Sequence, residues 1–181
     1  MTVYTLVLYS HLLGALALFI GFGIEWTASA LFRKASSTEQ VRAWLRVFKV
    51  SPPLFGAGLL VLLVSGGYLA SLTGAMKQGW IPATLIAIGA ALLLGLALVL
   101  PRMRRIRTAL PSLNEPVSTE LRARLSDPLL HTAVRTRFFV AAGIVYLMAA
   151  KLPFSPSMIA LTAALIVGLL FSAPAWRRPA L

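Results

Sequence analysis

Residues 3–32 read VYTLVLYSHLLGALALFIGFGIEWTASALF, and this apolar run dictates the architecture. It contains no Lys, Arg or Asp, and its ionisable groups other than tyrosine are His11 and Glu25. A helix crosses the hydrocarbon core of a bilayer with about 20 apolar residues, each rising about 1.5 Å. Residues 3–32 therefore predict a transmembrane helix that is longer than one crossing needs and that must tilt or project beyond the membrane.

Four further apolar segments follow, at about residues 53–73, 80–100, 136–152 and 156–175. Of the 181 residues, 59% are hydrophobic and 12% charged, whereas soluble domains are about half apolar and a quarter charged. A water-exposed domain of this size could not cover its apolar surface with so few charges. The sequence therefore predicts an all-α fold: a polytopic membrane helical bundle of five transmembrane helices, forming a single membrane domain over residues 1–181.

The basic residues orient these five segments. All but two of the 17 Lys and Arg residues follow the first, third and fifth segments, within 33–49, 102–137 and 177–178, and the exceptions are Lys77 and Lys151. Positive residues stay on the cytoplasmic side, so the N-terminus is expected outside and the C-terminus inside a bacterial cytoplasmic (inner) membrane. The same sorting explains the net charge of +12 through topology and contact with anionic lipid, and it disfavours a nucleic-acid partner.

Residues 36–50 predict an amphipathic cytoplasmic helix with Thr38 as its N-cap. Val41, Trp44, Leu45 and Phe48 follow the i, i+3, i+4, i+7 spacing of one apolar face. We favour a helix that lies at the lipid headgroups, and the alternative is a docking surface for a partner.

A second amphipathic cytoplasmic connection spans residues 101–135. Proline and an Asn114-Glu115-Pro116 turn interrupt it, and Ser118 or Thr119 can cap a short helix. Asp127-Pro128 then has the pattern of an N-cap followed by proline at the first helical position. This start places His131 and the following arginines on a cytoplasmic extension of the fourth helix.

His11 and Glu25 are the clearest candidates for intramembrane acid–base chemistry, since an ionisable group in the membrane is costly. At about 100° per residue they share one face of the helix with Gly14 and Ala15, which leave a notch beside His11. The two side chains are 14 positions apart, about 21 Å along a helix axis, so they cannot act on one atom together.

Two interpretations of this face remain open. In the first it is a packing face, on which Glu25 pairs with Arg135 or Arg137 and His11 hydrogen-bonds to a Ser or Tyr of another helix. In the second, His11 is an axial haem ligand or a proton-transfer group.

Lys151 closes the fourth segment and lies close in depth to His11. It either snorkels to the interface or, together with His11, holds an anionic ligand such as a porphyrin propionate. The sequence has no cysteine and no histidine cluster, so no metal site is predicted and catalytic residues are unknown. Gly56, Gly58 and the Gly66-Gly67 pair are interpreted as tight helix packing.

Several short motifs resemble a superfamily of small bacterial membrane proteins that includes HemJ-type protoporphyrinogen oxidases, CopD-type copper-resistance proteins and uncharacterised relatives. They are His11, Ser51-Pro52-Pro53, Ser65-Gly66-Gly67-Tyr68, Arg135 or Arg137, and Lys151-x-Pro153. The resemblance covers about the first four helices and implies a bundle in which His11 lies beside haem or porphyrin. Residues 80–100 lack the lysine that HemJ-type proteins look to need there, and this departure weighs against porphyrinogen oxidation even if the fold is shared.

Three functions are consistent with these observations. The first is a non-catalytic accessory, structural or assembly subunit of a larger respiratory or photosynthetic membrane complex, with other membrane subunits or further copies of the chain as partners. The second is a haem- or porphyrin-associated protein of HemJ-like type that uses His11. The third is a small proton- or cation-linked transporter that uses Glu25. The subunit role requires the fewest polar site residues, which suits a sequence with so few polar groups. The sequence therefore favours a protein that is not an enzyme.

Overall fold

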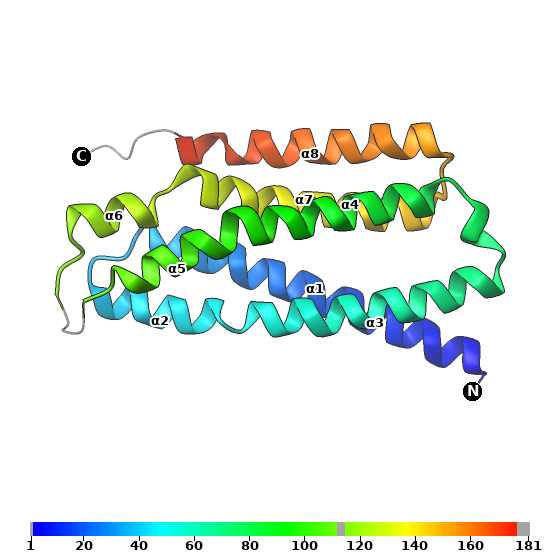
Figure 1. Ribbon diagram of the computed structural model, residues 1–181, viewed down its shortest axis with the longest axis horizontal. Helices are drawn as coiled ribbons and strands as arrows, with labels where there is room; N and C mark the ends of the chain where they lie inside the picture. The colour runs from blue at the N-terminus through cyan, green and yellow to red at the C-terminus, as the bar shows by residue number, and fades with distance from the viewer. Residues whose placement is uncertain (1, 112–114, 177–181) are drawn as a thin grey trace.

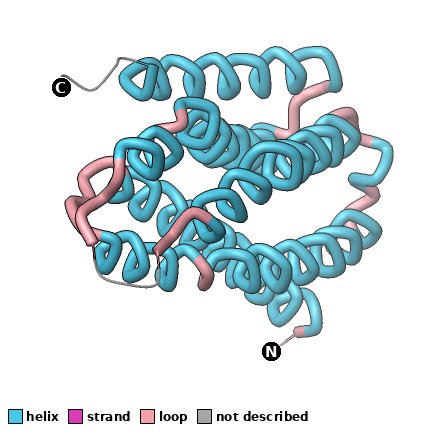
Figure 2. The backbone as a smooth tube through the Cα atoms, turned by 60° about the vertical axis from the view of Figure 1, so that its left-hand side comes forward, coloured by secondary structure: helices cyan, strands magenta, loops and turns pink. Residues whose placement is uncertain are grey.

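The computed structural model describes residues 2–111 and 115–176, and within them the chain consists of helices joined by short loops and turns (Figure 2). In chain order the elements are α1 (Val3–Phe32), α2 (Thr38–Phe48), α3 (Ser51–Leu72), the 3₁₀ turn η1 (Ala75–Lys77), α4 (Trp80–Leu94), the π-helical η2 (Gly95–Val99), α5 (Leu100–Thr108), α6 (Thr119–Leu125), α7 (Pro128–Ala150) and α8 (Phe154–Trp176). The predicted turn at Asn114 and the predicted basic tail at Arg177 and Arg178 lie outside the described residues.

The prediction of an all-α bundle with five membrane helices is confirmed. Five helical stretches among the described residues are long and apolar enough to cross a bilayer, and they run side by side along the molecule (Figure 1). The start of α1 and the end of α8 lie at opposite ends of the bundle (Figure 1), as an odd number of crossings requires. The 30 residues of α1 give a helix about 45 Å long, longer than the hydrocarbon core, and its first turns project to one side of the bundle (Figure 1).

Three predicted boundaries shift. Residue 51 rather than 53 begins α3, because prolines are tolerated in the first turn of a helix, where the backbone N–H groups have no helical partner. The N-cap of α2 is Ser37, whose hydroxyl accepts from the backbone N–H of Gln40, while Thr38 Oγ1 accepts from the N–H of Glu115. The third membrane helix does not end at residue 100, and it continues through η2 into α5.

Pro101 explains the π-helical turn. Its ring would clash with the carbonyl of the residue four positions earlier in a regular α-helix, and it has no N–H to donate. The wider turn from Gly95 to Val99 lies immediately before it and lets the helix continue without a break. The other predicted caps are confirmed, since Ser118 caps α6 and Asp127 caps α7 ahead of Pro128.

Glycines set the two closest helix pairs. A Cβ on Gly58 of α3 would lie 2.9 Å from the carbonyl oxygen of Gly14 in α1, so these two backbones touch directly. A Cβ on Gly168 of α8 would lie 2.8 Å from the Cα of Thr136 in α7. With α8 on one side, and α1 and α4 on others, α7 is the central helix of the bundle.

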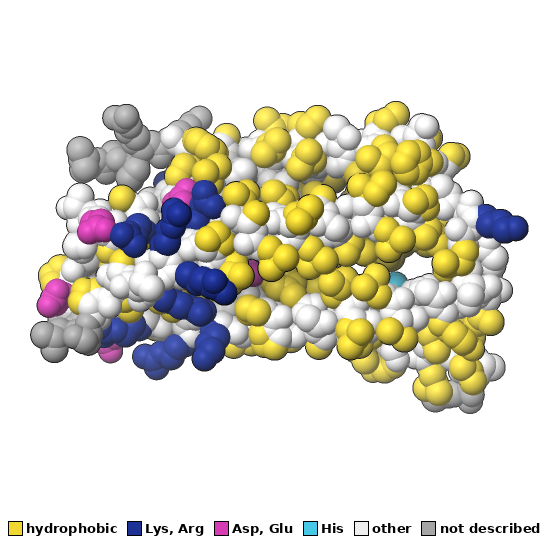
Figure 3. Space-filling view, in the orientation of Figure 1, with side chains coloured by type: hydrophobic (Ala, Val, Ile, Leu, Met, Phe, Trp, Pro, Cys, Tyr) yellow, Lys and Arg dark blue, Asp and Glu magenta, His cyan; other side chains and the backbone are white. Residues whose placement is uncertain are grey.

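Most of the charged side chains visible in Figure 3 gather at one end of the molecule, around α2, α5 and α6, which we call the basic end. A continuous hydrophobic core joins the elements there and includes Phe32, Phe48, Ile106, Leu125 and Leu130. This end is therefore packed in the manner of a water-soluble domain.

The half of the molecule toward the N-terminus, which we call the N-terminal half, is packed more loosely. There α1 lies on α3, while α4, α7 and α8 share a separate small core that includes Ala83, Val140 and Leu161. The two groups meet near mid-bundle, where the rings of Phe19 and Phe138 lie 5.7 Å apart in an edge-to-face contact. Beyond this contact the surface is hollowed (Figure 3).

Candidate functional site

The His11 side chain is half-buried between α1 and α3 in the N-terminal half. Its Nδ1 lies 2.9 Å from the hydroxyl oxygen of Ser65. The Ser65 hydroxyl donates its only proton to the carbonyl oxygen of Val61, one turn earlier in α3. Ser65 must therefore accept from His11, so Nδ1 carries the proton and Nε2 presents a lone pair.

Gly66 gives the imidazole ring its space. A Cβ at this position would lie 3.0 Å from Cε1 of His11, tighter than ordinary contacts. Ser65 thus orients the ring through a hydrogen bond, and Gly66 leaves room for the ring because it has no side chain. The predicted packing role applies to Gly58 and Gly66 but not to Gly56 and Gly67, whose Cβ atoms would meet no atom within 4 Å.

A second polar site lies nearer the basic end, where Glu25 of α1 meets Arg137 of α7. Glu25 Oε2 accepts from Arg137 Nη1 at 2.8 Å, and the two side chains are 4% and 8% exposed. The Ser51 hydroxyl, at the start of α3, lies 3.1 Å from Glu25 Oε1. This cluster links three of the five membrane helices.

The Arg137 guanidinium is enclosed by aromatic rings and a glycine. Its Cζ lies 5.3 Å from the ring centre of Phe22 and 4.9 Å from that of Phe55, and cation–π attraction offsets part of its desolvation. A Cβ on Gly95 would come within 3.1 Å of the same carbon. Arg137 Nε is buried and has no hydrogen-bond partner among the described residues. Sequence reasoning missed Gly95 and both rings, which carry no polar signal.

The remaining predicted residues lie elsewhere. Arg135 donates to the carbonyl oxygen of Phe171 in α8 at 2.7 Å and lies over the ring of Trp26, so it does not reach Glu25. Lys151 is the exposed C-terminal cap of α7, in the left-handed region with φ 49°, and no described hydrogen bond joins it to His11. His131 is fully buried at the basic end, with Nε2 3.0 Å from the carbonyl oxygen of Leu125.

The described residues contain no group of three or more His, Cys, Asp or Glu side chains that could hold a metal ion. His11 therefore offers a single imidazole ligand, and the Glu25–Arg137 cluster is neutralised internally. The two sites lie at different depths in the bundle, as their separation along α1 requires.

These observations define a multi-pass helical membrane protein embedded in the lipid bilayer. Residues 5–152 match the family described as predicted integral membrane protein (DUF2269), and the chain belongs to that family. The matched region includes nearly all of α1 and continues through α7, and it ends before α8 begins. No curated protein matches the chain, and no solved structure does.

Proposed function

We propose that the protein binds haem or a related porphyrin in the N-terminal half, with His11 as the ligand. The observation that carries this proposal is the contact between His11 Nδ1 and the Ser65 hydroxyl, from which we infer that Nδ1 carries the proton and Nε2 presents a lone pair. Histidines that bind metals through one nitrogen almost always donate the other N–H to a protein acceptor, which sets the tautomer and the ring direction.

The surroundings of His11 fit a flat apolar ligand. Gly66 removes the side chain that would crowd the imidazole, and the surface of this half is hollowed (Figure 3). A bound haem would supply an iron centre for electron transfer or ligand binding, and His11 would supply one imidazole nitrogen in an apolar surround. Lys151 is the cation that we assign to a propionate, since it ends α7 in the same half. The likeness to HemJ-type and CopD-type proteins supports this choice.

We place the protein in a bacterial cytoplasmic membrane, with the basic end in the cytoplasm and the N-terminus outside. Lys and Arg on α2, α5 and α6 lie together at one end, as the rule that positive residues remain cytoplasmic requires (Figure 3). His11 then lies in the outer half of the bilayer.

An absorption spectrum of the gently purified protein tests the haem proposal. The proposal predicts a Soret band in the wild type, its loss in His11→Ala, and a weakened or shifted band in Ser65→Ala, which keeps the ligand but frees the ring. His131→Gln is the matched control, because His131 lies at the basic end. A wild type that gains no Soret band when haem is supplied, or a band that survives His11→Ala and disappears in His131→Gln, would overturn the proposal.

A second candidate is a non-catalytic accessory, structural or assembly subunit of a larger respiratory or photosynthetic complex, and one face of α3 favours it. Gly56 and Gly67 lie about three helical turns apart on one side of α3 with open space above them. Leu60 and Val64, on the same side, are 65% and 67% exposed. Small residues beside large ones let another membrane helix approach closely.

Crosslinking in native membranes tests the subunit candidate. A photoreactive side chain at Gly67 should capture a partner subunit or a second copy of the chain, whereas one at Gly66, beneath His11, should not. Capture of lipid alone at Gly67 would count against a subunit role.

For Glu25 we propose a structural rather than a transport role, so Glu25→Gln should leave proton and cation fluxes in liposomes at the wild-type level.

A further inference from the structure

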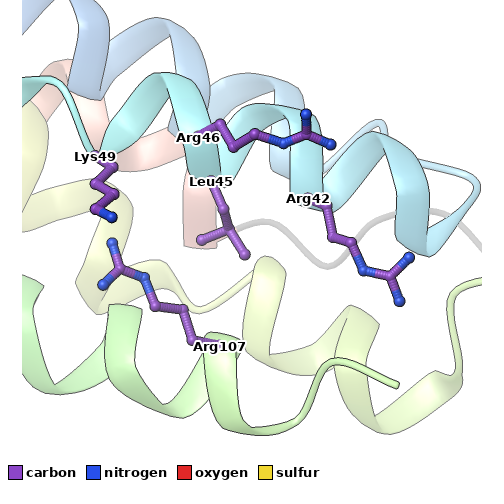
Figure 4. A pocket seen from close by; sticks show the side chains of 5 residues that line it. All are labelled: Arg42, Leu45, Arg46, Lys49 and Arg107. Carbon is purple, nitrogen blue, oxygen red and sulfur yellow. The ribbon is translucent and has the colours of Figure 1, made fainter. Parts of the chain in front are cut away.

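A groove of about 340 Å³ lies at the basic end between α2 and α5 (Figure 4). Arg42, Leu45, Arg46 and the C-terminal cap Lys49 line it from α2, and Arg107 lines it from α5. Four of these five residues are cationic and none is acidic. The fifth, Leu45, is buried and gives the groove an apolar floor.

Three of the cations in this groove, Arg46, Lys49 and Arg107, have no carboxylate partner among the described residues. Figure 4 shows the charged ends of Lys49 and Arg107 pointing toward each other across the groove. Like charges in such proximity destabilise each other unless an anion lies between them.

A second groove at the same end is a natural comparison. Arg102, Arg105, Arg124 and Asp127 line it. There Arg102 Nε lies 2.8 Å from the Asp127 carboxylate, and Arg124 Nη2 lies 2.6 Å from that of Glu120. The protein therefore supplies anions to Arg102 and Arg124 at the second groove but none to Arg46, Lys49 and Arg107 at the first.

The position of the first groove identifies where its anion comes from. Its α2 wall leads directly into the membrane helix α3, and its α5 wall continues the membrane helix α4. Val47 and Val50, at the same end of α2, are exposed to the surroundings. Arg42 is held in place because its Nη2 donates to the carbonyl oxygen of Pro111. A prearranged cationic groove with an apolar floor thus lies where the lipid headgroups begin.

We propose that this groove binds the headgroup of an anionic phospholipid through its phosphate, with a preference for headgroups that carry two phosphates. Guanidinium groups bind phosphate oxygens through paired hydrogen bonds, and basic pockets beside membrane helices accept such headgroups. The combined charge of Arg46, Lys49 and Arg107 exceeds that of one phosphodiester, which favours a headgroup with two phosphates. Leu45 faces the apolar part of the lipid. The site lies at the opposite end of the bundle from His11, so it does not depend on the haem proposal.

Native mass spectrometry of the full chain in mild detergent tests this site by titration with three lipids. Cardiolipin, with two phosphates, should bind more tightly than phosphatidylglycerol, and phosphatidylcholine should bind most weakly. Arg107→Gln and Lys49→Gln should each weaken cardiolipin binding about fivefold. The matched control is Arg104→Gln, which removes the same charge from an exposed position of α5 outside the groove and should change binding less than twofold.

Equal losses in Arg107→Gln and Arg104→Gln would overturn the proposal, because the whole basic surface would then bind lipid without a defined site. Equal affinity for cardiolipin and phosphatidylglycerol would overturn the preference for two phosphates. Inorganic phosphate and pyrophosphate are added as water-soluble competitors of cardiolipin. Displacement of cardiolipin by either at micromolar concentration would assign the groove to a soluble phosphate compound instead of a lipid.

Discussion

The basic end and the N-terminal half share the long helices α1 and α7, but their side chains pack in different ways. At the basic end, apolar side chains of α1, α2, α5, α6 and α7 turn inward and form one core. In the N-terminal half, large apolar side chains such as Leu13, Leu16 and Ile20 face outward. Water drives apolar surface inward, whereas lipid does not, so close packing in a membrane depends on small residues and polar contacts.

The contrast also shows where polar groups are tolerated. At the basic end some Lys and Arg pair with protein carboxylates, as Arg102 does with Asp127, and others are exposed. Deeper in the bundle the ionisable side chains are held by other helices, Glu25 by Arg137 and Ser51, and His11 by Ser65. The Glu25–Arg137 pair lies at the border between the two regions and ties them together.

The largest expected effect comes from breaking that pair. Glu25→Ala leaves the Arg137 guanidinium buried without its anion, which costs about 3–5 kcal/mol of folding free energy. Unfolding in mild detergent, followed by circular dichroism, measures the change. Replacing both residues, as Glu25→Leu with Arg137→Met, should restore most of the stability. A Glu25→Ala variant as stable as the wild type would show that the pair does not join the regions.

The next effect compares the two kinds of packing directly. Phe32 is completely buried at the basic end, and Phe32→Ala should cost about 3–5 kcal/mol because it leaves a cavity in a close-packed core. Leu16 is 58% exposed in the N-terminal half, and Leu16→Ala should change stability by less than about 0.5 kcal/mol. Both are measured by unfolding in lipid nanodiscs. Similar losses for the two variants would remove the distinction between the regions.

Helix contact through glycine should give a smaller effect. Gly58→Ala pushes a methyl group against the Gly14 carbonyl and should cost about 1–3 kcal/mol by forcing α1 and α3 apart. Gly67→Ala meets open space and should stabilise the isolated protein by about 0.5–1 kcal/mol through helix propensity. Thermal unfolding of Gly58→Ala and Gly67→Ala in the same detergent measures the stability of each variant relative to the wild type. A neutral Gly58→Ala would mean that α1 and α3 are separable.

Sequence patterns predicted the helices well because hydrocarbon length and charge sorting act on single segments. The N-cap at Asp127 and the amphipathic helix α2 were also predictable from the sequence, since both depend on the spacing of neighbouring residues. The continuation past Pro101 was not, because it requires a π-helical turn that no simple sequence pattern specifies.

The contacts of the candidate site were only partly predictable. One helix face grouped His11 with Glu25, but the rotation of the other helices about their axes decides which partners they meet. That rotation selects Arg137 rather than Arg135 for Glu25, and Ser65 for His11. The direct backbone contact at Gly14 and Gly58 sets the position of α3 on α1, and an apolar sequence rich in glycine does not reveal which glycines touch.

The orientation of the two ends across the bilayer is the claim on which the rest depends, and the absence of cysteine from the sequence makes it directly measurable. Single variants Lys77→Cys and Arg104→Cys place one thiol at each end of the bundle. A membrane-impermeant maleimide added to intact bacterial cells should label Lys77→Cys and leave Arg104→Cys unlabelled until the cells are opened. Labelling of Arg104→Cys from outside, with Lys77→Cys protected, would contradict the account.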